Sequence, residues 1–363
     1  MNFQDNIPLT YILYFAGIFI FSVLINSILL RLAKTLGIRN NSEMQTARWS
    51  PTVKPALGGI SFFMIFLFSF LFIGLSLGNF SSYLSDKKLL GFLYTVTLAF
   101  LMGLADDAFD TRPLLKFSTQ LICALILIAT GTHMKCFQSD FVNYLLTVLW
   151  VVGLMNSINM LDNMDGITTL VSMVMITFFI SEKLYINEGL NPQAFLCLSV
   201  LGALAGFLIF NFHPSKMFMG DTGSQFLGVF LAIMGIEFCW NVPVINSVNL
   251  PVHFPVKNLV LVALVFILPL TDTTTVFINR LAKGKSPFIG GKDHTTHHLF
   301  FKGITEKRIA ILFVFIGSVA CLLAHYVSAS TSLNMYDYII YLSFPLPVFL
   351  FLFLNTRIRK KVK

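Results

Sequence analysis

Long apolar runs separated by short polar segments dominate this sequence. A helix needs roughly 20 mainly apolar residues to cross a bilayer, and the pattern predicts about eleven transmembrane helices. The runs lie at 9–30, 57–78, 89–105, 117–131, 141–160, 166–181, 193–212, 224–240, 258–278, 309–330 and 337–354. No Lys or Arg precedes the first run, which is also too long for the core of a cleavable signal. We therefore expect an all-α, polytopic integral membrane protein in which residues 1–363 form a single membrane-embedded domain.

Composition agrees with this interpretation. Hydrophobic residues make up 56% of the chain and charged residues 12%, whereas soluble domains carry roughly 25% charged residues. An ordinary soluble globule and an intrinsically disordered chain are therefore excluded. The five Cys residues are scattered and follow no metal-binding or disulfide spacing, so we interpret them as small hydrophobic residues.

Positive charge is distributed unequally between alternate loops. With the N-terminus outside, 20 of the 25 Lys and Arg residues fall in the inward segments. These segments are 31–54, 106–116, 161–165, 213–223, 279–308 and 355–363. Because Lys and Arg mark the cytoplasmic side of a membrane protein, we expect an outside N-terminus and a cytoplasmic C-terminus. This asymmetry accounts for the formal net charge of +8 without a nucleic-acid partner.

Polar and ionisable residues concentrate in five segments on the same predicted side. They are Asp106, Asp107 and Asp110; Asn156, Asn159, Asp162, Asn163 and Asp165; Asp221, Thr222 and Ser224; Asp272; and His294, His297 and His298. Ionisable residues at membrane depth are costly and usually functional. Convergence of five distant segments on one face predicts an active site at the cytoplasmic mouth.

The acidic segment suggests a bound cation. On a helix, Asp106 and Asp110 are four residues apart and share a face. Adjacent carboxylates repel each other unless a cation lies between them or one stays protonated. Mg²⁺ fits such a place because it takes a few carboxylates together with substrate oxygens. A solvated loop with a helix-capping Asp is the alternative.

The asparagine segment suggests metal or nucleotide recognition. Asn156, Asn159 and Asn163 have the spacing of one helical stripe, flanked by Asp162 and Asp165. Amide and carboxylate groups together can coordinate a metal ion, and they can also read a nucleobase edge or a ribose. The alternative for the end of this segment is ordinary turn chemistry.

Two further segments suit phosphate binding. Met219 to Ser224 opens a predicted helix, where Gly lets the backbone approach a ligand and the helix N-terminus favours anions or their metal complexes. A simple N-cap is the alternative. His294, His297 and His298 can share a helical face. A three-His zinc site is disfavoured because no Glu or Cys stands in the expected place, so we expect contacts to phosphate. For the basic tail, binding of lipid headgroups alone is the alternative.

In combination these residues resemble the polyprenyl-phosphate N-acetylhexosamine-1-phosphate transferase family, within glycosyltransferase family 4, over essentially the whole chain. The matching segments are Pro55 to Gly59, Asp106-Asp107 with Lys116, Asn156 to Gly166, Met219 to Ser224, and Asp272 with Arg280. Asn163 stands where the family usually has Gly. The His segment reads His-x-x-His-His, not the triple-His loop of the branch that transfers the peptidoglycan muramyl-pentapeptide. This favours the branch resembling undecaprenyl-phosphate GlcNAc-1-phosphate transferases.

The resemblance implies a phosphotransferase of the bacterial inner membrane, with its active site facing the cytoplasm. Such an enzyme moves a sugar-1-phosphate from a UDP-N-acetylhexosamine to polyprenyl phosphate and releases UMP, which initiates a cell-envelope polysaccharide such as lipopolysaccharide O-antigen, teichoic acid or capsule. Phosphoryl transfer depends mainly on positioning and charge neutralisation. We therefore expect Mg²⁺ as the cofactor, with Mn²⁺ as the alternative. A homodimer stays open.

The same resemblance implies roles for individual residues. The expected metal ligands are Asn159 and Asp221, and the expected catalytic positions are Asp106, Asp107, Asp162 and Asp165. The expected substrate contacts are Lys116, Asn156, His294, His297 and His298. The acidic pair need not supply a general base, because the nucleophile is a phosphate monoester whose second pKa is about 6.

Two other classes of membrane protein remain as alternatives. A cation-coupled transporter would also use intramembrane acids, but transporters place them near the midplane, usually with inverted repeats or broken helices. Here the acids lie at one rim and we detect no repeat. A lipid-diphosphate hydrolase would need a water nucleophile and would release product without lipid linkage. Within the family, the muramyl-pentapeptide branch is the alternative to the simpler UDP-sugar branch.

Overall fold

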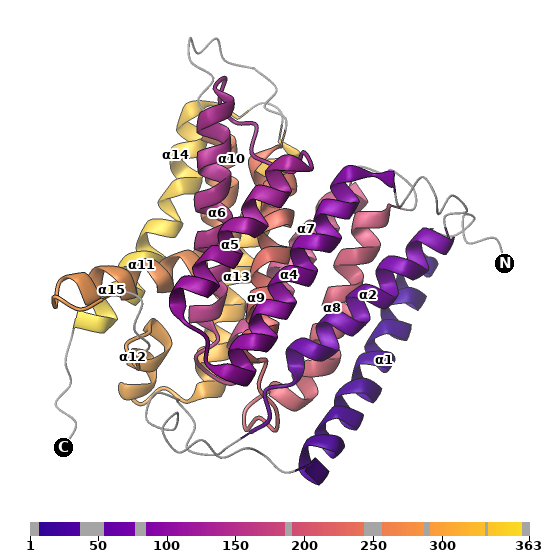
Figure 1. The fold of residues 1–363 in the computed structure, drawn as a ribbon. Helices are drawn as coiled ribbons and strands as arrows, with labels where there is room; N and C mark the ends of the chain where they lie inside the picture. Colours follow the sequence, from indigo (N-terminus) through magenta and orange to yellow (C-terminus); the bar gives the residue numbers. More distant parts are fainter. Residues whose placement is uncertain are drawn as a thin grey trace.

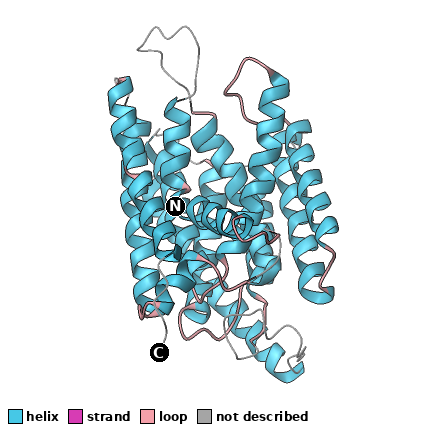
Figure 2. Ribbon diagram, turned by 90° about the vertical axis from the view of Figure 1, so that its left-hand side faces the viewer, coloured by secondary structure: helices cyan, strands magenta, loops and turns pink. Residues whose placement is uncertain are grey.

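A computed structural model describes most of the chain as helices. The described residues are 7–36, 54–76, 85–185, 191–242, 256–286, 291–330 and 333–357. Most of the predicted loop 31–54, residues 287–290 of the predicted loop 279–308 and residues 358–363 of the basic tail 355–363 lie outside them. Within the described ranges the only extended pairing is a single bridge between Ala56 and Phe218, and Figure 2 shows helices joined by loops. The expected all-α class is confirmed.

The helices follow the predicted apolar runs. They are α1 (Ile7–Leu36), α2 (Gly58–Ser76), α4 (Lys87–Phe109), α5 (Pro113–Ala129), α6 (Asp140–Leu161), α7 (Ile167–Tyr185), α8 (Pro192–Asn211), α9 (Gly220–Gly235) with the π-helical turn η2 (Ile236–Trp240), α10 (Val256–Val265), α11 (Ile267–Leu281), α12 (Thr295–Phe301), α13 (Glu306–Ala329), α14 (Met335–Ser343) and α15 (Pro345–Arg357). Figure 1 shows the long helices side by side, with α11 turned across them and α12 near the lower end.

Fewer helices than the eleven predicted are long and apolar enough to span a membrane. Nine helices in the described part of the chain meet both criteria, or ten if the bent pair α10 and α11 counts as one span. The predicted run that does not meet them is the fourth, 117–131, which corresponds to α5 with 17 residues. At about 1.5 Å per residue, α5 falls short of the roughly 30 Å hydrocarbon core. The predicted orientation and the single-domain assignment stay predictions.

The bend between α10 and α11 follows from a proline. The two helices meet at 82°, and Pro269 is the third residue of α11. Because proline lacks an N–H and its ring collides with the carbonyl four residues earlier, α10 cannot continue straight past Val265. The carbonyl of Pro269 instead accepts a hydrogen bond of 2.8 Å from Ser157 of α6. Beyond the bend, α11 packs against α6.

Helix α9 forms the centre of the bundle. All fourteen residues from Thr222 to Gly235 are buried, and the helix packs against α2, α4 and α6. Phe226 and Phe230 of α9 stack beside Phe66 of α2. The phenylalanine-rich second run is thus divided by helical periodicity, because Phe62, Phe66 and Phe70 are buried whereas Phe68 and Phe72 are exposed.

Two glycines bring neighbouring helices close to the first turn of α9. A Cβ atom on Gly59 of α2 would lie 2.2 Å from the backbone nitrogen of Gly223, and one on Gly103 of α4 would lie 2.4 Å from the carbonyl oxygen of Asp221. The segment before α2 also pairs with the segment before α9, since the nitrogen of Gly59 donates to the carbonyl of Met219 at 3.0 Å. The start of α9 is therefore held between α2 and α4.

Candidate active site

The carboxylate of Asp107 caps helix α9. Its Oδ1 atom accepts a hydrogen bond from the backbone nitrogen of Asp221 at 3.0 Å. Its Oδ2 atom accepts bonds from the backbone nitrogen of Thr222 at 2.9 Å and from the Thr222 hydroxyl at 2.6 Å. The N-cap residue Met219 makes no side-chain cap bond. A residue of α4 therefore satisfies the free N–H groups at the start of α9, where a negative charge is also favoured by the helix dipole.

Lys116 lies between two carboxylates. Its Nζ atom is 2.9 Å from Oδ2 of Asp106 and 3.3 Å from Oδ1 of Asp221. Asp106 is further fixed by Thr111, whose backbone nitrogen and hydroxyl donate to its Oδ1 atom at 3.0 and 2.5 Å. Lys116 thus separates Asp106 from Asp221, whereas the prediction of a cation among Asp106, Asp107 and Asp110 stays a prediction. The arrangement balances charge at the junction of α4, α5 and α9.

Two amide groups of α6 connect it to its neighbours. The Nδ2 atom of Asn159 donates to Asp221 and, at 2.8 Å, to the hydroxyl of Ser224. Asn156 donates to Gln120 of α5 at 2.8 Å, and Gln120 donates to Gln225 of α9 at 3.0 Å. Polar groups buried in an apolar bundle need such partners. The amides therefore fix the relative positions of α5, α6 and α9 at this end.

The predicted stripe of three asparagines ends early. Helix α6 stops at Leu161, so Asn163 lies in the following turn and not on the helical face of Asn156 and Asn159. Its Oδ1 atom accepts a bond from Thr296 at 2.5 Å, which ties the turn to α12. The prediction of a continuous stripe was wrong because it extrapolated helical periodicity past the end of α6.

Asp162 occupies the C-cap of α6, close to several other acids. Burial, followed by the neighbouring carboxylates of Asp221, Asp107 and Asp165, raises the pKa of its carboxyl to about 8. Protonation at neutral pH relieves repulsion among these groups. A cation bound in their midst would reverse this preference, because an opposite charge favours the ionised form.

Asp165 faces the loop between α8 and α9. The backbone nitrogen and the hydroxyl of Ser215 donate to it at 2.9 and 2.8 Å. Lys54 Nζ lies 3.6 Å from its Oδ2 atom, and Nδ1 of His213 lies 3.3 Å from the same oxygen. Asp165 is 8% exposed, so this set of donors compensates for the loss of water around the carboxylate.

The histidine segment is anchored on Asp272 of α11. The Asp272 carboxylate accepts bonds from Nδ1 of His294 at 2.8 Å and from the backbone nitrogen of Thr295 at 2.8 Å. Nε2 of His297 lies 3.3 Å from the carbonyl oxygen of Asn163. Burial, followed by the nearby His294, lowers the pKa of His297 to about 4, so its ring is neutral at pH 7. The anchored segment directs His294 and His297 toward α6.

One cavity of about 980 Å³ connects these groups. Ten of the eleven predicted site residues line it, namely Asp106, Asp107, Lys116, Asn156, Asn159, Asp162, Asp165, Asp221, His294 and His297. The eleventh, His298, is not among the lining residues; its ring lies 6.1 Å from that of Phe301. Of the three histidines predicted to contact phosphate, only His294 and His297 therefore line the cavity.

An apolar arm extends the cavity away from the acids. It is lined by Phe117 of α5, by Val148, Leu149, Val152 and Gly153 of α6, and by Phe277 of α11. Phe117, Leu149 and Phe277 are at least 44% exposed on the side of the bundle. The cavity therefore has a polar end at the helix termini and an arm that opens sideways between α5, α6 and α11.

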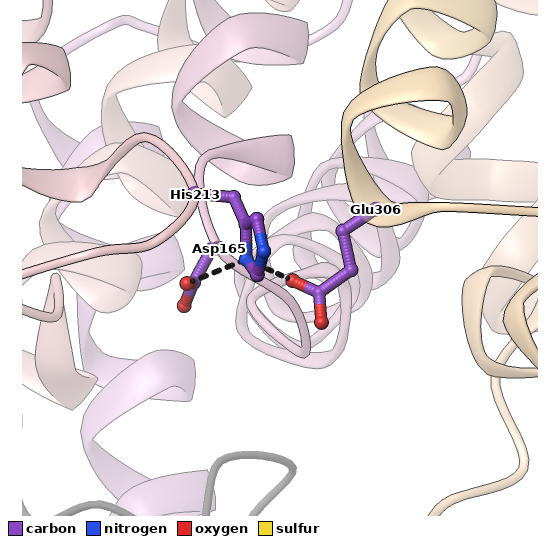
Figure 3. A group of neighbouring side chains, drawn as sticks. All are labelled: Asp165, His213 and Glu306. Carbon is purple, nitrogen blue, oxygen red and sulfur yellow. Dashed lines mark hydrogen bonds and ion pairs between the residues drawn. The ribbon is translucent and has the colours of Figure 1, made fainter.

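The residues present suit a hard divalent cation. Asp221 supplies carboxylate oxygens and Asn159 an amide oxygen, while Asp106 and Asp107 lie on the neighbouring helix; oxygen ligands of this kind are those that Mg²⁺ takes. Rotation of the Asn159 amide would turn its oxygen toward Asp221. Separately, Asp165, His213 and Glu306 form the one group of three metal-capable side chains found in the described ranges with ligand atoms within 4.8 Å of one another (Figure 3).

Sequence reasoning missed several residues that complete the site. From the sequence, Lys54 entered only the count of basic residues in the inward loops. No role was predicted for Gln120, His213, Ser215 or Glu306. Lys54 and His213 flank Asp165, and Gln120 bridges α6 and α9. A polar residue within a predicted apolar run was the available signal for Gln120, since such groups need partners. Glu306 has no comparable signal, because it begins a helix beside ordinary loop residues.

Comparison with known proteins agrees with the motifs. Residues 89–239 match the model of the family described as glycosyl transferase family 4. A probable undecaprenyl-phosphate N-acetylglucosaminyl 1-phosphate transferase of Bacillus subtilis is 26% identical over 325 residues, 86% of this chain and 85% of the relative. A decaprenyl-phosphate N-acetylglucosaminephosphotransferase of Mycobacterium leprae is 27% identical over 237 residues, 60% of each chain.

The peptidoglycan branch is also among the relatives. A phospho-N-acetylmuramoyl-pentapeptide-transferase of Limosilactobacillus reuteri is 25% identical over 309 residues, 80% of this chain and 88% of the relative. The matched region 89–239 contains the acidic pair, Lys116, the asparagine segment and the start of α9. The resemblance predicted from these motifs is thus confirmed, since residues 89–239 match the model of glycosyl transferase family 4.

Proposed function

We propose that this protein transfers an N-acetylhexosamine-1-phosphate from a UDP-sugar to polyprenyl phosphate, with release of UMP. The observation that carries the proposal is the cavity in which ten predicted site residues from distant segments meet. Its polar end suits the charged groups of two phosphate-bearing substrates, and its apolar arm suits a lipid. Neither a soluble donor alone nor a lipid alone would require both ends.

The apolar arm accounts for the lipid acceptor. A polyprenyl tail has to stay in the membrane while its phosphate reaches the polar end of the cavity. The arm opens between α5, α6 and α11, where Phe117, Leu149 and Phe277 are exposed. We place the first part of the prenyl chain against these side chains, so that the terminal phosphate points toward Lys116.

The polar end accounts for charge neutralisation. Asn159 and Asp221 would hold Mg²⁺, or Mn²⁺ in its place, and the ion would neutralise the diphosphate of the donor. Lys116 would contact phosphate while keeping Asp106 and Asp221 apart. His294 and His297, held by Asp272 and Asn163, would hydrogen-bond the donor from the opposite wall. Because His297 is neutral and its Nε2 proton faces the carbonyl of Asn163, its Nδ1 atom would accept a hydrogen bond from the donor without adding charge.

Asp107 would act by positioning and not as a base. Both of its oxygens are occupied by donors from the first turn of α9, so it fixes the turn that carries Asp221. The acceptor phosphate, with a second pKa of about 6, is mostly dianionic at neutral pH. It therefore needs little deprotonation before it attacks the donor, and a general base would contribute little.

The donor is best proposed as a UDP-N-acetylhexosamine. Two of the relatives named above are N-acetylglucosaminyl transferases, and the histidine segment lacks the triple-His loop of the muramyl-pentapeptide branch. The excess of Lys and Arg in alternate loops supports a cytoplasmic site in a bacterial inner membrane. The product would initiate a cell-envelope polysaccharide.

One experiment tests the proposal and separates it from its alternatives. The purified protein is incubated with undecaprenyl phosphate, Mg²⁺ and each of a panel of UDP-sugars, and the lipid fraction and UMP are measured. We expect a lipid-linked sugar diphosphate and equimolar UMP with a UDP-N-acetylhexosamine. Sugar phosphate without lipid linkage would indicate a hydrolase. Ion uptake into vesicles without UMP would indicate a transporter, and either result would overturn the proposal.

A further inference from the structure

Three side chains from separate segments meet beside the cavity. Asp165 lies in the turn between α6 and α7, His213 follows α8, and Glu306 is the first residue of α13. In Figure 3 the ring of His213 lies between the two carboxylates. Its Nδ1 atom is 2.7 Å from Oε2 of Glu306 and 3.3 Å from Oδ2 of Asp165.

Hydrogen bonding explains this geometry better than metal binding. The Nδ1 atom of His213 is hydrogen-bonded to Asp165 and lies 2.7 Å from Oε2 of Glu306. Two ligand atoms around a zinc ion, each at about 2.0–2.1 Å from the metal, would lie further apart than this second distance. Lys54 Nζ already lies 3.6 Å from the same Asp165 oxygen and donates to Ser215 at 3.0 Å. A divalent cation would have to displace or face this ammonium group.

Glu306 also ends the histidine segment, residues 294–306, and contacts His213 there. The segment from His294 to Glu306 begins on Asp272, through His294 and Thr295, and is held in its middle by the bond from Thr296 to Asn163. Its last residue reaches His213. The pair of Glu306 and His213 therefore connects the start of α13 to the corner of the cavity that holds Asp165.

We propose that His213, oriented by Glu306, is a positioning residue that holds Asp165 for binding of the nucleotide-sugar donor. The proposal rests on the function proposed above, in which Asp165 serves the donor. The Nδ1 atom of His213 donates to one oxygen of Asp165, to which the backbone nitrogen of Ser215 also donates. The Glu306 carboxylate lies 2.7 Å from the same Nδ1 atom and orients the ring. The acceptor arm at Phe117 and Leu149 lies on other helices and does not depend on this contact.

The experiment compares kinetic constants for the two substrates separately. His213→Ala and Glu306→Ala should each raise KM for the UDP-sugar by roughly 10-fold, the scale at which outer partners of a site residue act. The KM for undecaprenyl phosphate should change by less than about 2-fold. Because both residues act through one contact, the double variant should be no worse than the poorer single variant.

Conservative variants separate positioning from a general loss of structure. His213→Asn places an N–H donor near the position of Nδ1, and Glu306→Gln keeps an acceptor oxygen, so both should return the donor KM to within about 3-fold of the wild-type value. Lys307→Ala, an exposed neighbour of Glu306 in the same helical turn, serves as the matched control. Thermal unfolding in detergent checks that each variant is folded.

The outcomes distinguish this inference from the proposed function. If both alanine variants kept the kcat and the donor KM of the wild-type protein, the positioning role would be overturned but the proposed function would not. A double variant whose donor KM rises by the product of the two single effects would also overturn it. So would a wild-type protein that loses activity when zinc is chelated while the activity of His213→Ala is insensitive to chelation. A wild-type protein without transfer from any UDP-sugar would overturn both the function and the inference.

Discussion

At the scale of single residues, Asp107 has the environment of a structural anchor. Three donors from the first turn of α9 occupy its two oxygens, so these oxygens hold the turn that carries Asp221. The two adjacent aspartates have different roles. Asp107 fixes the helix that carries Asp221, whereas Asp106 pairs with Lys116. Adjacent identical residues thus serve different purposes because their side chains leave α4 in different directions.

Replacing Asp107 by Asn tests this assignment. The amide keeps one acceptor but places an N–H group against the N–H groups of α9, so we expect a loss of about 1–2 kcal/mol in stability and a severe loss in kcat. The pH–rate profile above pH 7 should stay flat in both proteins. Disappearance of a pH limb in the variant would instead identify Asp107 as a general base.

His297 provides a second test at this scale. Its folded-state pKa of about 4 lies below the unfolded value of about 6.5, so between these values the unfolded chain binds more protons. Stability should therefore fall as the pH is lowered from 6.5 to 4, by up to about 3 kcal/mol, and should show no contribution from this group above pH 7. The measurement is the thermal unfolding temperature in detergent against pH.

The matched variant for that measurement is His297→Gln. It keeps a hydrogen-bond donor near Asn163 but has no group that titrates in this range. Its unfolding temperature should depend less steeply on pH than that of the wild-type protein. Identical slopes in the two proteins would show that His297 does not carry the predicted burial penalty.

At the scale of helices, the site depends on how closely α4 approaches the first turn of α9. Gly103 lies against the backbone of Asp221 and Thr222, where an added Cβ atom would come within 2.4 Å. Backbone atoms cannot move aside as a flexible side chain can, so the two helices have to separate. Such a shift would pull Asp107 and Lys116 away from Asp221 together.

Gly103→Ala should therefore reduce both stability and transfer. We expect a loss of about 1–3 kcal/mol and a decrease in kcat that exceeds the loss of folded protein, because the site geometry changes as well. Gly17→Ala in α1 is the matched control, since nothing lies within 4 Å of its added Cβ atom; it should be neutral or stabilising by up to about 1 kcal/mol. Equal effects of the two substitutions would contradict the role assigned to close packing.

At the scale of the whole molecule, the sequence predicted which segments form the site but not how their side chains pair. A helix that crosses a bilayer has to be apolar over its length, so the apolar runs predict the helices. The motifs mark loops on one predicted side, so ten of the site residues could be predicted to lie together. Pairing depends on which helix end meets which, and spacing along the chain does not contain that information. The cap of α9 by Asp107, the absence of His298 from the cavity lining and the contact of Glu306 with His213 are of this kind.

The shape of the cavity was equally beyond the sequence. The bend at Pro269 turns α11 across the bundle, and this turn creates one wall of the apolar arm through Phe277. A proline in an apolar run indicates a kink but neither its angle nor its direction. The arm that we assign to the lipid acceptor therefore emerges only when α5, α6 and α11 are assembled.

The most direct test of the account is transfer by an Asp221→Ala variant. Purified wild-type protein, Asp221→Ala and the control Asp140→Ala, which removes an exposed carboxylate at the opposite end of α6, are supplied with Mg²⁺, undecaprenyl phosphate and the UDP-sugar accepted by the wild type. The account predicts that lipid-linked product and UMP disappear in Asp221→Ala, while that protein stays folded and Asp140→Ala retains activity. Undiminished transfer by folded Asp221→Ala would contradict it.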